Sequence, residues 1–340
     1  MNLRIERFDI AEATPADIAA HVELVVASTT VDRPGDPLPN RDGVVASLTT
    51  GLSGRGLPQV WTAHAGDELV GKGIVGQPAD ENDHMSIIDM QVAPTHRRRG
   101  VGSALLREMM PTIAAPGRTL ATSWSVVEDT PGAFWAEKLG GRVTTRVVVQ
   151  AVDLATVDRT LWEIPAPAGY RPVAWKNAAP DDLVESFAKA RTAIEEADLD
   201  DWSYQVPAWT AERVRQAEAE LRARNAEQRI VAVLHESSGD VVGLTELVLY
   251  SPEATLGFQY DTAVLPEHRG HGLGAFMKAQ QLLGIAAERP TVQRVGTSTN
   301  ASNESSLRMN RRVGYHPVRV GMAVEMPSAE LAERVQSTRQ

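Results

Sequence analysis

The chain contains the stretch Asp89-Met-Gln-Val92-Ala-Pro94-Thr-His96-Arg97-Arg-Arg-Gly100-Val-Gly102 and, further on, the stretch Asp261-Thr-Ala-Val264-Leu-Pro266-Glu-His268-Arg269-Gly-His-Gly272-Leu-Gly274. Corresponding residues lie 172 positions apart throughout, so neither copy has gained or lost a residue. Seven side chains coincide, namely Asp, Val, Pro, His, Arg and two Gly. A repeat with this spacing predicts two copies of one domain.

Length and composition narrow the class of protein. The 340 residues are enough for two domains with separate cores, and the apolar fraction of 43% is that of a globular protein. No apolar run approaches the ~18 residues that a membrane-spanning helix needs. The absence of cysteine excludes disulfides and a cysteine nucleophile, and no residue spacing suggests a metal site. The net charge of −10 argues against nucleic-acid binding. We therefore expect a cytoplasmic protein that binds neither membranes nor nucleic acids.

Other segments follow the same repeat. Strands are expected at 85–92 and 256–264, each ended by a proline, which cannot donate a hydrogen bond to a sheet. A helix follows each glycine pair, and the strands 142–152 and 316–326 are expected to close the two halves. The stretch Ile164-Pro-Ala-Pro-Ala-Gly169 is typical of the end of a linker. We expect an N-terminal domain at 1–155, a linker at 156–164, a C-terminal domain at 165–327 and a tail at 328–340.

The glycines of each copy suit an anion site. A glycine-containing turn between a strand and a helix leaves backbone N–H groups free, and the helix N-terminus adds a positive dipole. An arginine three residues earlier adds charge for phosphate oxygens. A single copy would fit a simple tight turn equally well, but two copies in register favour binding. A dinucleotide fingerprint is excluded because Leu105 and Met277 stand where its third glycine belongs, and no P-loop sequence is present.

The pattern resembles the pyrophosphate loop of the GNAT superfamily of coenzyme A-dependent N-acetyltransferases, with Arg97 and Arg269 opening its two copies. The tandem arrangement is similar to that of mycothiol synthase-like actinobacterial proteins. The resemblance implies an α/β (α+β) fold class, with two tandem GNAT domains that each have a mixed, mostly antiparallel central sheet flanked by helices. It also implies acetyl-CoA as the acyl donor, transferred to a small-molecule or peptide amine.

The resemblance also assigns residues that would contact coenzyme A. In the C-terminal half these are Thr262, Ala263, Val264, Arg269, Gly270, His271, Gly272, Leu273, Gly274, Ala275 and Asn303. In the N-terminal half they are Met90, Gln91, Val92, Arg97, Arg98, Arg99, Gly100, Val101, Gly102 and Ser103.

The tyrosine that often serves as general acid in this family is missing from both halves. Asn310 stands at its place in the C-terminal half and Ala136 in the N-terminal half. Because Asn303 fits the family's cofactor-contacting asparagine, we expect the C-terminal domain to be catalytic and the N-terminal one to be degenerate. The alternative is an acyl-CoA-binding or scaffold protein of GNAT fold with little or no catalysis.

The reaction needs a base more than an acid. An amine with a lysine-like pKa near 10.4 is deprotonated at pH 7 only to about one part in 2,500. Without a cysteine nucleophile, direct attack in a ternary complex is the default. Candidate bases are Glu246 and Asp261, and Tyr260 is a candidate acid. Each also has a structural interpretation: a solvent-facing strand residue for Glu246, a hydrogen-bond acceptor for Asp261 and a satisfied core hydroxyl for Tyr260.

The acceptor and the oligomeric state stay open. The segment Glu195-Glu-Ala-Asp-Leu-Asp-Asp201 holds five acids and precedes Trp202 and Tyr204. It suits either an anionic, aromatic entrance for a cationic amine or a solvated loop. The two halves could form an internal pseudo-dimer in a monomer, or the chain could be a homodimer.

Overall fold

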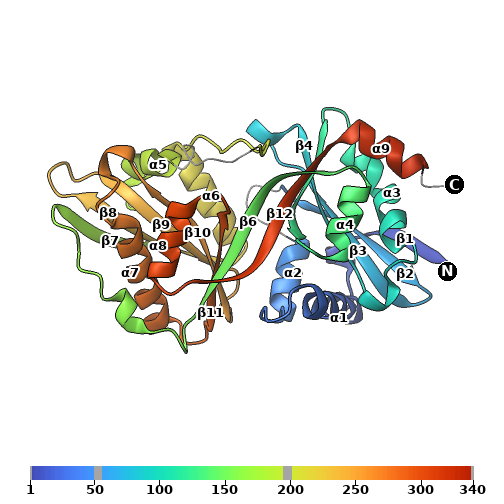
Figure 1. Ribbon diagram of the computed structural model, residues 1–340, viewed down its shortest axis with the longest axis horizontal. Helices are drawn as coiled ribbons and strands as arrows, with labels where there is room; N and C mark the ends of the chain where they lie inside the picture. Colours follow the sequence, from blue (N-terminus) through green and yellow to red (C-terminus); the bar gives the residue numbers. More distant parts are fainter. Residues whose placement is uncertain (1, 50–55, 194–200, 338–340) are drawn as a thin grey trace. The chain divides into compact units, whose positions relative to one another are not determined.

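The structure is a computed structural model that describes residues 2–49, 56–193 and 201–337. The chain forms two compact units (Figure 1). Unit 1 comprises Met1–Arg146, Asp200–Gln205 and Arg319–Gln340, and unit 2 comprises Val147–Leu199 and Val206–Val318. Across the described ranges, no helix is both long enough and apolar enough to cross a membrane.

Unit 1 is built on a sheet with the strand order β1-β2-β3-β4-β5-β12. Its strands are β1 Leu3–Phe8, β2 Pro58–Ala65, β3 Glu68–Gly76, β4 Met85–Val92, β5 Leu120–Val127 and the end of β12 His316–Pro327. Its helices are α1 Pro15–Asp32, α2 Arg41–Thr49, α3 Val101–Ile113, α4 Pro131–Lys138 and α9 Ser328–Ser337. Neighbouring strands run antiparallel, apart from the parallel pair β4 and β5.

Unit 2 repeats this plan with the strand order β6-β11-β10-β9-β8-β7. Its strands are the end of β6 Arg142–Asp153, then β7 Tyr170–Lys176, β8 Glu227–His235, β9 Val241–Leu249, β10 Leu256–Val264 and β11 Arg294–Asn300. Its helices are α5 Val184–Thr192, α6 Ala211–Ala223, α7 Leu273–Glu288 and α8 Glu304–Arg312, with the short 3₁₀ helix η4 at Arg159–Trp162. Here the parallel pair is β10 and β11. The expected mixed, mostly antiparallel sheet is thus confirmed in each unit.

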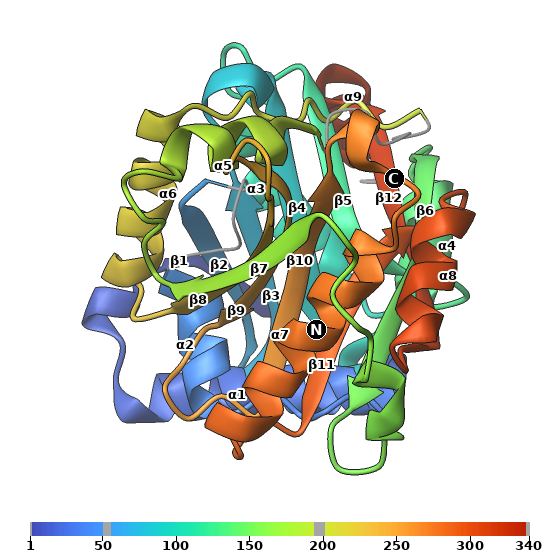
Figure 2. The same ribbon diagram turned by 90° about the vertical axis from the view of Figure 1, so that its left-hand side faces the viewer.

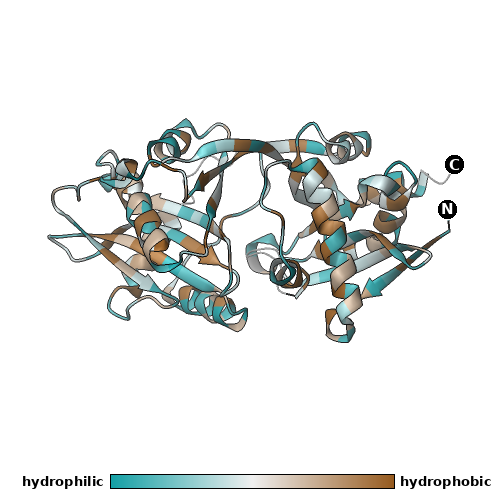
Figure 3. Ribbon diagram, turned by 90° about the horizontal axis from the view of Figure 1, so that it is seen from below, coloured by the Kyte–Doolittle hydropathy of each residue, from teal (hydrophilic) through white to brown (hydrophobic). Residues whose placement is uncertain are grey.

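The core lies on both faces of each sheet. In unit 1, α1 and α2 pack on one face, and α3 and α9 pack on the other. In unit 2, α5 and α6 cover one face, and α7 lies on the other (Figure 2). The inner strands β3, β8 and β9 are therefore largely buried, whereas the edge strands β1 and β7 are partly exposed. Hydrophobic and hydrophilic residues are mixed along both the strands and the helices (Figure 3).

The closing strands correct the domain boundaries expected from the sequence. The end of β6 pairs with β11 in unit 2, and the end of β12 pairs with β5 in unit 1. The physical reason is apolar burial: Val152 of β6 lies in the core of unit 2, whereas Met322, Val324 and Met326 of β12 lie in the core of unit 1. Residues 328–337, expected to be part of a tail, form α9, which packs on α3.

Trp162 should anchor the segment that follows β6. Its ring is fully buried, and its indole N–H donates to the carbonyl oxygen of Val313 over 3.0 Å. We expect Trp162→Ala to lower the free energy of unfolding by about 3–5 kcal/mol, measured by urea denaturation. The neighbouring Leu161 is 39% exposed, so Leu161→Ala should change it by less than about 1 kcal/mol. Equal effects of the two changes would contradict this assignment.

Candidate active site

The parallel strands of each unit separate shortly after they pair. In unit 2, β10 and β11 pair only from Leu256 to Phe258 on β10, opposite Arg294 to Gly296. In unit 1, β4 and β5 pair only from Met85 to Ile87 on β4. Beyond these pairs, the described residues of β10 and β4 have no partner strand on that edge. Backbone groups inside a sheet require hydrogen-bond partners, so each opening suits an extended ligand that pairs like a strand.

One difference between the two openings is a β-bulge. In unit 2, Gln259 lies opposite Leu247 and Thr262 lies opposite Thr245, so β10 carries one extra residue between them. Within the pairs described for unit 1, β4 follows β3 without a register shift from Ile87 to Val92. A bulge re-aims side chains and backbone groups next to a site. The extra residue falls at Tyr260 and Asp261, beside the opening of unit 2.

The loop after each of these strands has the same backbone conformation. Arg98 and Gly100 have φ angles of 61° and 83°, and the corresponding Gly270 and Gly272 have φ angles of 83° and 76°. The following helices, α3 and α7, begin without a side-chain cap. Consecutive N–H groups from such a turn and the first helical turn form an anion-binding concavity. Both loops therefore fit a phosphate group.

The arginine that opens each loop fastens it to the strand. The Nε of Arg97 donates to the carbonyl oxygen of Val92, and the Nε of Arg269 donates to that of Val264, each over 3.1 Å. The other two nitrogens of Arg97 bind the carboxylate of Asp32 at 2.7 Å. For Arg269, the phosphate contact expected from the sequence therefore stays a prediction. In unit 1, the charge of Arg97 is already paired with that of Asp32.

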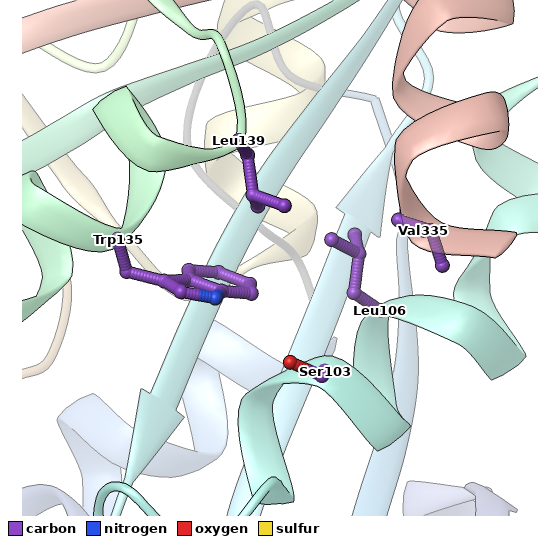
Figure 4. A pocket seen from close by; sticks show the side chains of 5 residues that line it. All are labelled: Ser103, Leu106, Trp135, Leu139 and Val335. Atoms are coloured by element: carbon purple, nitrogen blue, oxygen red, sulfur yellow. The ribbon is translucent and has the colours of Figure 1, made fainter. Parts of the chain in front are cut away.

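The second glycine of each loop faces the helix that follows β5 or β11. A Cβ on Gly102 would lie 3.8 Å from the ring of Trp135, and one on Gly274 would lie 2.5 Å from the sulfur of Met309. In unit 1, Trp135 points toward Ser103 and Leu106 (Figure 4). Together with Leu139 and Val335, these side chains line a cavity of about 10 Å³. This cavity holds at most a water molecule, so it is a packing gap of the core.

The bulge of unit 2 places Asp261 at the end of a row of charges. The guanidinium of Arg191 lies 2.6 Å from the carboxylate of Glu246 and 3.7 Å from that of Asp261. Arg191 also stacks on Trp209, with its guanidinium carbon 3.8 Å from the ring centroid. Glu246 and Arg191 are buried, whereas the Asp261 side chain is 38% exposed. Asp261 is thus the member of the row that a ligand can reach.

The surroundings of Asp261 make it a base suited to neutral pH. Burial raises the pKa of its carboxyl to about 6, an effect that Arg191 opposes and Glu246 reinforces. At pH 7 it is mostly a carboxylate. A base of this strength can accept a proton and release it again near neutrality.

The other candidate catalytic residues are held by neighbours. Glu246 accepts hydrogen bonds from Arg191 and, over 2.5 Å, from the side-chain amide of Gln228, so no lone carboxylate oxygen faces the opening. The hydroxyl of Tyr260 lies 2.5 Å from that of Tyr250. Glu246 is therefore better suited to tuning Asp261 than to accepting the substrate's proton.

The two asparagines singled out in the sequence have structural partners. Asn303 caps α8, where its side chain accepts a hydrogen bond from the N–H of Ser306 over 2.9 Å. Asn310, at the expected tyrosine position, is buried and donates to Gln150 and Thr299 over 2.8 and 3.0 Å. An amide in this place cannot act as a general acid.

Sequence reasoning missed Arg191, which connects Glu246 with Asp261. The sequence does indicate that Arg191 is buried, because it follows Phe187 and Ala188 at helical spacing on an apolar face. A charged residue on such a face needs a buried partner. Which strand residue supplies that partner depends on tertiary packing.

Unit 1 has a different arrangement at the corresponding place. Ile74 occupies the position of Glu246 and pairs with Asp89 across β3 and β4. The cation near Asp89 is the buried Lys72, whose pKa burial lowers to about 8 while Asp89 opposes that shift. The matching aspartates thus have unlike surroundings, and the charge row of unit 2 is not repeated.

The expected acidic entrance lies mostly outside the described residues, since Glu195, Glu196 and Asp198 fall in the segment 194–200. The part that follows belongs to unit 1. There the rings of Trp202 and Tyr204 lie with their centroids 5.2 and 5.0 Å from that of Trp124. These two aromatic side chains therefore pack on β5.

Comparison with known families and structures agrees with this geometry. Residues 57–140 match a model described as Acetyltransferase (GNAT) domain, and residues 192–315 match one described as Acetyltransferase (GNAT) family. The chain belongs to the GNAT superfamily of acetyltransferases. It is a tandem GNAT protein.

Two relatives are named mycothiol acetyltransferase. The one from Cellulomonas flavigena is 27% identical over 287 residues, covering 79% of this chain and 75% of the relative. The one from Nocardia farcinica is 26% identical over 248 residues, covering 71% of this chain and 74% of the relative.

Solved structures share the fold of this GNAT chain. A tandem GNAT protein from the clavulanic acid biosynthesis pathway superimposes with a TM-score of 0.79 at 22% identity, covering 96% of this chain and 99% of its own. A GCN5-related N-acetyltransferase from Sphaerobacter thermophilus gives a TM-score of 0.69 at 19% identity, covering 96% of both.

Glu246 should raise the pKa of Asp261. In Glu246→Gln the negative charge that reinforces the effect of burial is gone, so the pKa of the Asp261 carboxyl should fall below about 6. Carbon NMR of protein labelled at the aspartate carboxyl would follow this titration. Glu218→Gln breaks another buried ion pair of unit 2, with Arg215, and should leave the titration of Asp261 unchanged. An unchanged or higher pKa in Glu246→Gln would contradict the assignment.

Proposed function

We propose that the chain is an acetyl-CoA-dependent N-acetyltransferase that acetylates a small-molecule amine by direct attack, with unit 2 as the working half. The observation that carries the proposal is the bulge of β10. It places the half-exposed carboxylate of Asp261 beside the opening between β10 and β11. A donor site and a base thus meet at one point of unit 2.

The residues of unit 2 fit acetyl-CoA, which supplies an acyl thioester when bound. The N–H groups of the loop from Gly270 to Gly274 would hold the pyrophosphate, supported by the uncapped start of α7. The open edge of β10 from Gln259 to Val264 would pair with the amides of the pantetheine arm. Backbone N–H groups on this edge would polarise the thioester carbonyl.

Asp261 would handle the proton that makes the acceptor reactive. An alkylamine needs to lose a proton before it can attack, because its ammonium form has no lone pair. The Asp261 carboxylate accepts that proton, and the buried pair Arg191–Glu246 keeps the carboxylate in place. Removal of a general base typically costs about 10²–10⁴-fold in rate.

The proposal assigns unit 1 no catalytic role. Its strand β4 carries no bulge within the described pairs, and Ile74 replaces the glutamate that tunes the base. Its loop nevertheless keeps the backbone conformation that suits a phosphate. Binding of coenzyme A without turnover is therefore the proposed property of unit 1.

The relatives named mycothiol acetyltransferase make mycothiol-related amines the first acceptors to test. The competing function is a coenzyme A-binding protein without catalysis. A screen of amines that reads out free thiol separates the two, because a pure binder releases no coenzyme A above the rate of hydrolysis.

The matched aspartates provide the sharpest test. Asp261→Asn should lower kcat at least about a hundredfold, because the amide cannot accept a proton. Asp89→Asn changes the corresponding residue of unit 1 and should leave kcat within about twofold. Steady-state thiol release measures both. Loss of activity in Asp89→Asn alone would move the chemistry to unit 1.

The pH dependence should report the same group. Because the pKa of Asp261 is raised to about 6, the carboxylate is present above this pH and is lost as the pH falls through it. We expect kcat/KM to decline tenfold per pH unit below about 6, measured with the best acceptor of the screen. An acid limb that persists unchanged in Asp261→Asn would exclude Asp261 as its origin.

A further inference from the structure

Helix α7 carries a lysine in the middle of its buried face. Lys278 is 2% exposed. Gly274 lies one turn before it on the same side of the helix, and Leu282 lies one turn after it. A Cβ on Gly274 would lie 3.8 Å from the methyl group of Thr262 on β10, and Leu282 packs in one cluster with Val295 of β11. Lys278 therefore faces the sheet where β10 and β11 separate.

This lysine has no carboxylate partner among the described residues, and burial is the cause that lowers its pKa to about 7. Its Nζ lies 5.3 Å from the ring centroid of Tyr315, which follows α8. The strands on this side present the uncharged Thr245, Gln259 and Thr262, which are joined by side-chain hydrogen bonds. A buried amine without a counter-ion is costly and marks a candidate functional group.

Several buried polar side-chain atoms of unit 2 have no hydrogen-bond partner among the described residues. The side-chain oxygens of Gln259, Asn310 and Tyr315 are buried and accept or donate no hydrogen bond within the described part of the chain. Folded proteins satisfy nearly all such atoms. Gln259 lies on β10, Asn310 lies on α8, and Tyr315, whose ring Lys278 approaches, follows α8. The unmet hydrogen-bonding capacity of these three oxygens suits a polar ligand.

We propose that Lys278 donates a proton to the sulfur of the departing coenzyme A thiolate and so replaces the tyrosine that is missing at Asn310. The assignment rests on the proposed acetyl transfer. The ammonium of Lys278 gives one proton to sulfur as the carbon–sulfur bond breaks, leaving a neutral amine and a free thiol. Asp261 takes one proton from the acceptor ammonium, and the second proton on the new amide nitrogen passes to solvent. Lys278 regains its proton from water, and Asp261 releases its proton to water before the next turnover.

The buried position makes Lys278 a strong enough acid. A thiol has a pKa of about 8.5, and an ordinary lysine, at about 10.4, would donate to its thiolate against a difference of about two pKa units. With its pKa lowered to about 7, Lys278 donates in the favourable direction by about 1.5 units. It can also regain a proton near neutral pH, as turnover requires.

The first test needs no acceptor. Coenzyme A is bound to the protein, and its thiolate is followed by ultraviolet absorbance as the pH is raised. In the wild type, Lys278 still carries its proton below pH 7, so at about pH 6.5 the bound thiol should form several-fold more thiolate than in Lys278→Met. Above about pH 8, where the lysine is neutral, the two titrations should converge. Equal titrations in the two proteins would overturn the proposal. A wild-type chain that binds no coenzyme A would overturn both this proposal and the proposed function.

The second test separates chemistry from binding. Lys278→Met should lower kcat about a hundredfold while the KM for acetyl-CoA changes less than about threefold. The matched change in unit 1, Leu106→Met, should alter neither constant. Unchanged kcat in Lys278→Met would also overturn the assignment. If thiolate formation depends on Lys278 but the chain acetylates no amine, Lys278 would still lie beside the bound thiol. The proposed acetyl transfer would then be wrong.

The variant should fold, because it removes a buried charge. The pKa of Lys278 is lower in the folded chain than in the unfolded one, so the native lysine destabilises the fold increasingly as the pH falls from about 10 to 7. The melting temperature of Lys278→Met should therefore exceed that of the wild type, and by more at pH 7 than at pH 10. A melting temperature below that of the wild type at pH 7 would contradict the buried, unpaired state of Lys278.

Discussion

The short pairing of β10 with β11 is the constraint on which the rest of the site depends. A parallel pair that continued along both strands would satisfy its own backbone and leave no room for a ligand. Because pairing stops after Phe258, the backbone of β10 from Gln259 onward has an open edge. The bulge at Tyr260 and Asp261 lies on this same stretch. The arginine at the start of the loop then fastens the end of β10 to the turn that is proposed to hold a phosphate.

Charge is divided between the two faces of this sheet. On the side of α5, Arg191 and Glu246 form a buried ion pair beside the partly exposed Asp261. Arg191 lowers the pKa of the Asp261 carboxyl, and Glu246 raises it. On the side of α7, Lys278 is buried with uncharged polar neighbours. The face with the carboxylate suits a base, and the face with the amine suits an acid. Unit 1 has the opening and the loop but neither of these charge arrangements, because Ile74 and Leu106 occupy the corresponding places.

Much of this organisation could be predicted from the sequence because it is local. The repeat gives the strand, the turn and the helix, and the glycines at Gly270 and Gly272 take the left-handed conformation that the turn needs. The bulge could not be predicted, because it depends on how β10 registers with β9. The pairing of β6 with β11 and of β12 with β5 was also out of reach, since similar halves offer similar edges to either closing strand. Lys278 was overlooked, although its place on the buried side of a periodic helix was readable.

Hydrogen exchange of backbone amides, measured with and without coenzyme A, tests most directly whether unit 2 holds the donor site. Peptides that cover the open edge of β10 at 259–264 and the loop at 270–275 report on unit 2, and those at 87–92 and 98–103 report on unit 1. The account predicts that coenzyme A slows exchange in both regions of unit 2, because its phosphates and amides engage those N–H groups. Slowed exchange confined to unit 1, with no change at 259–275, would contradict the account.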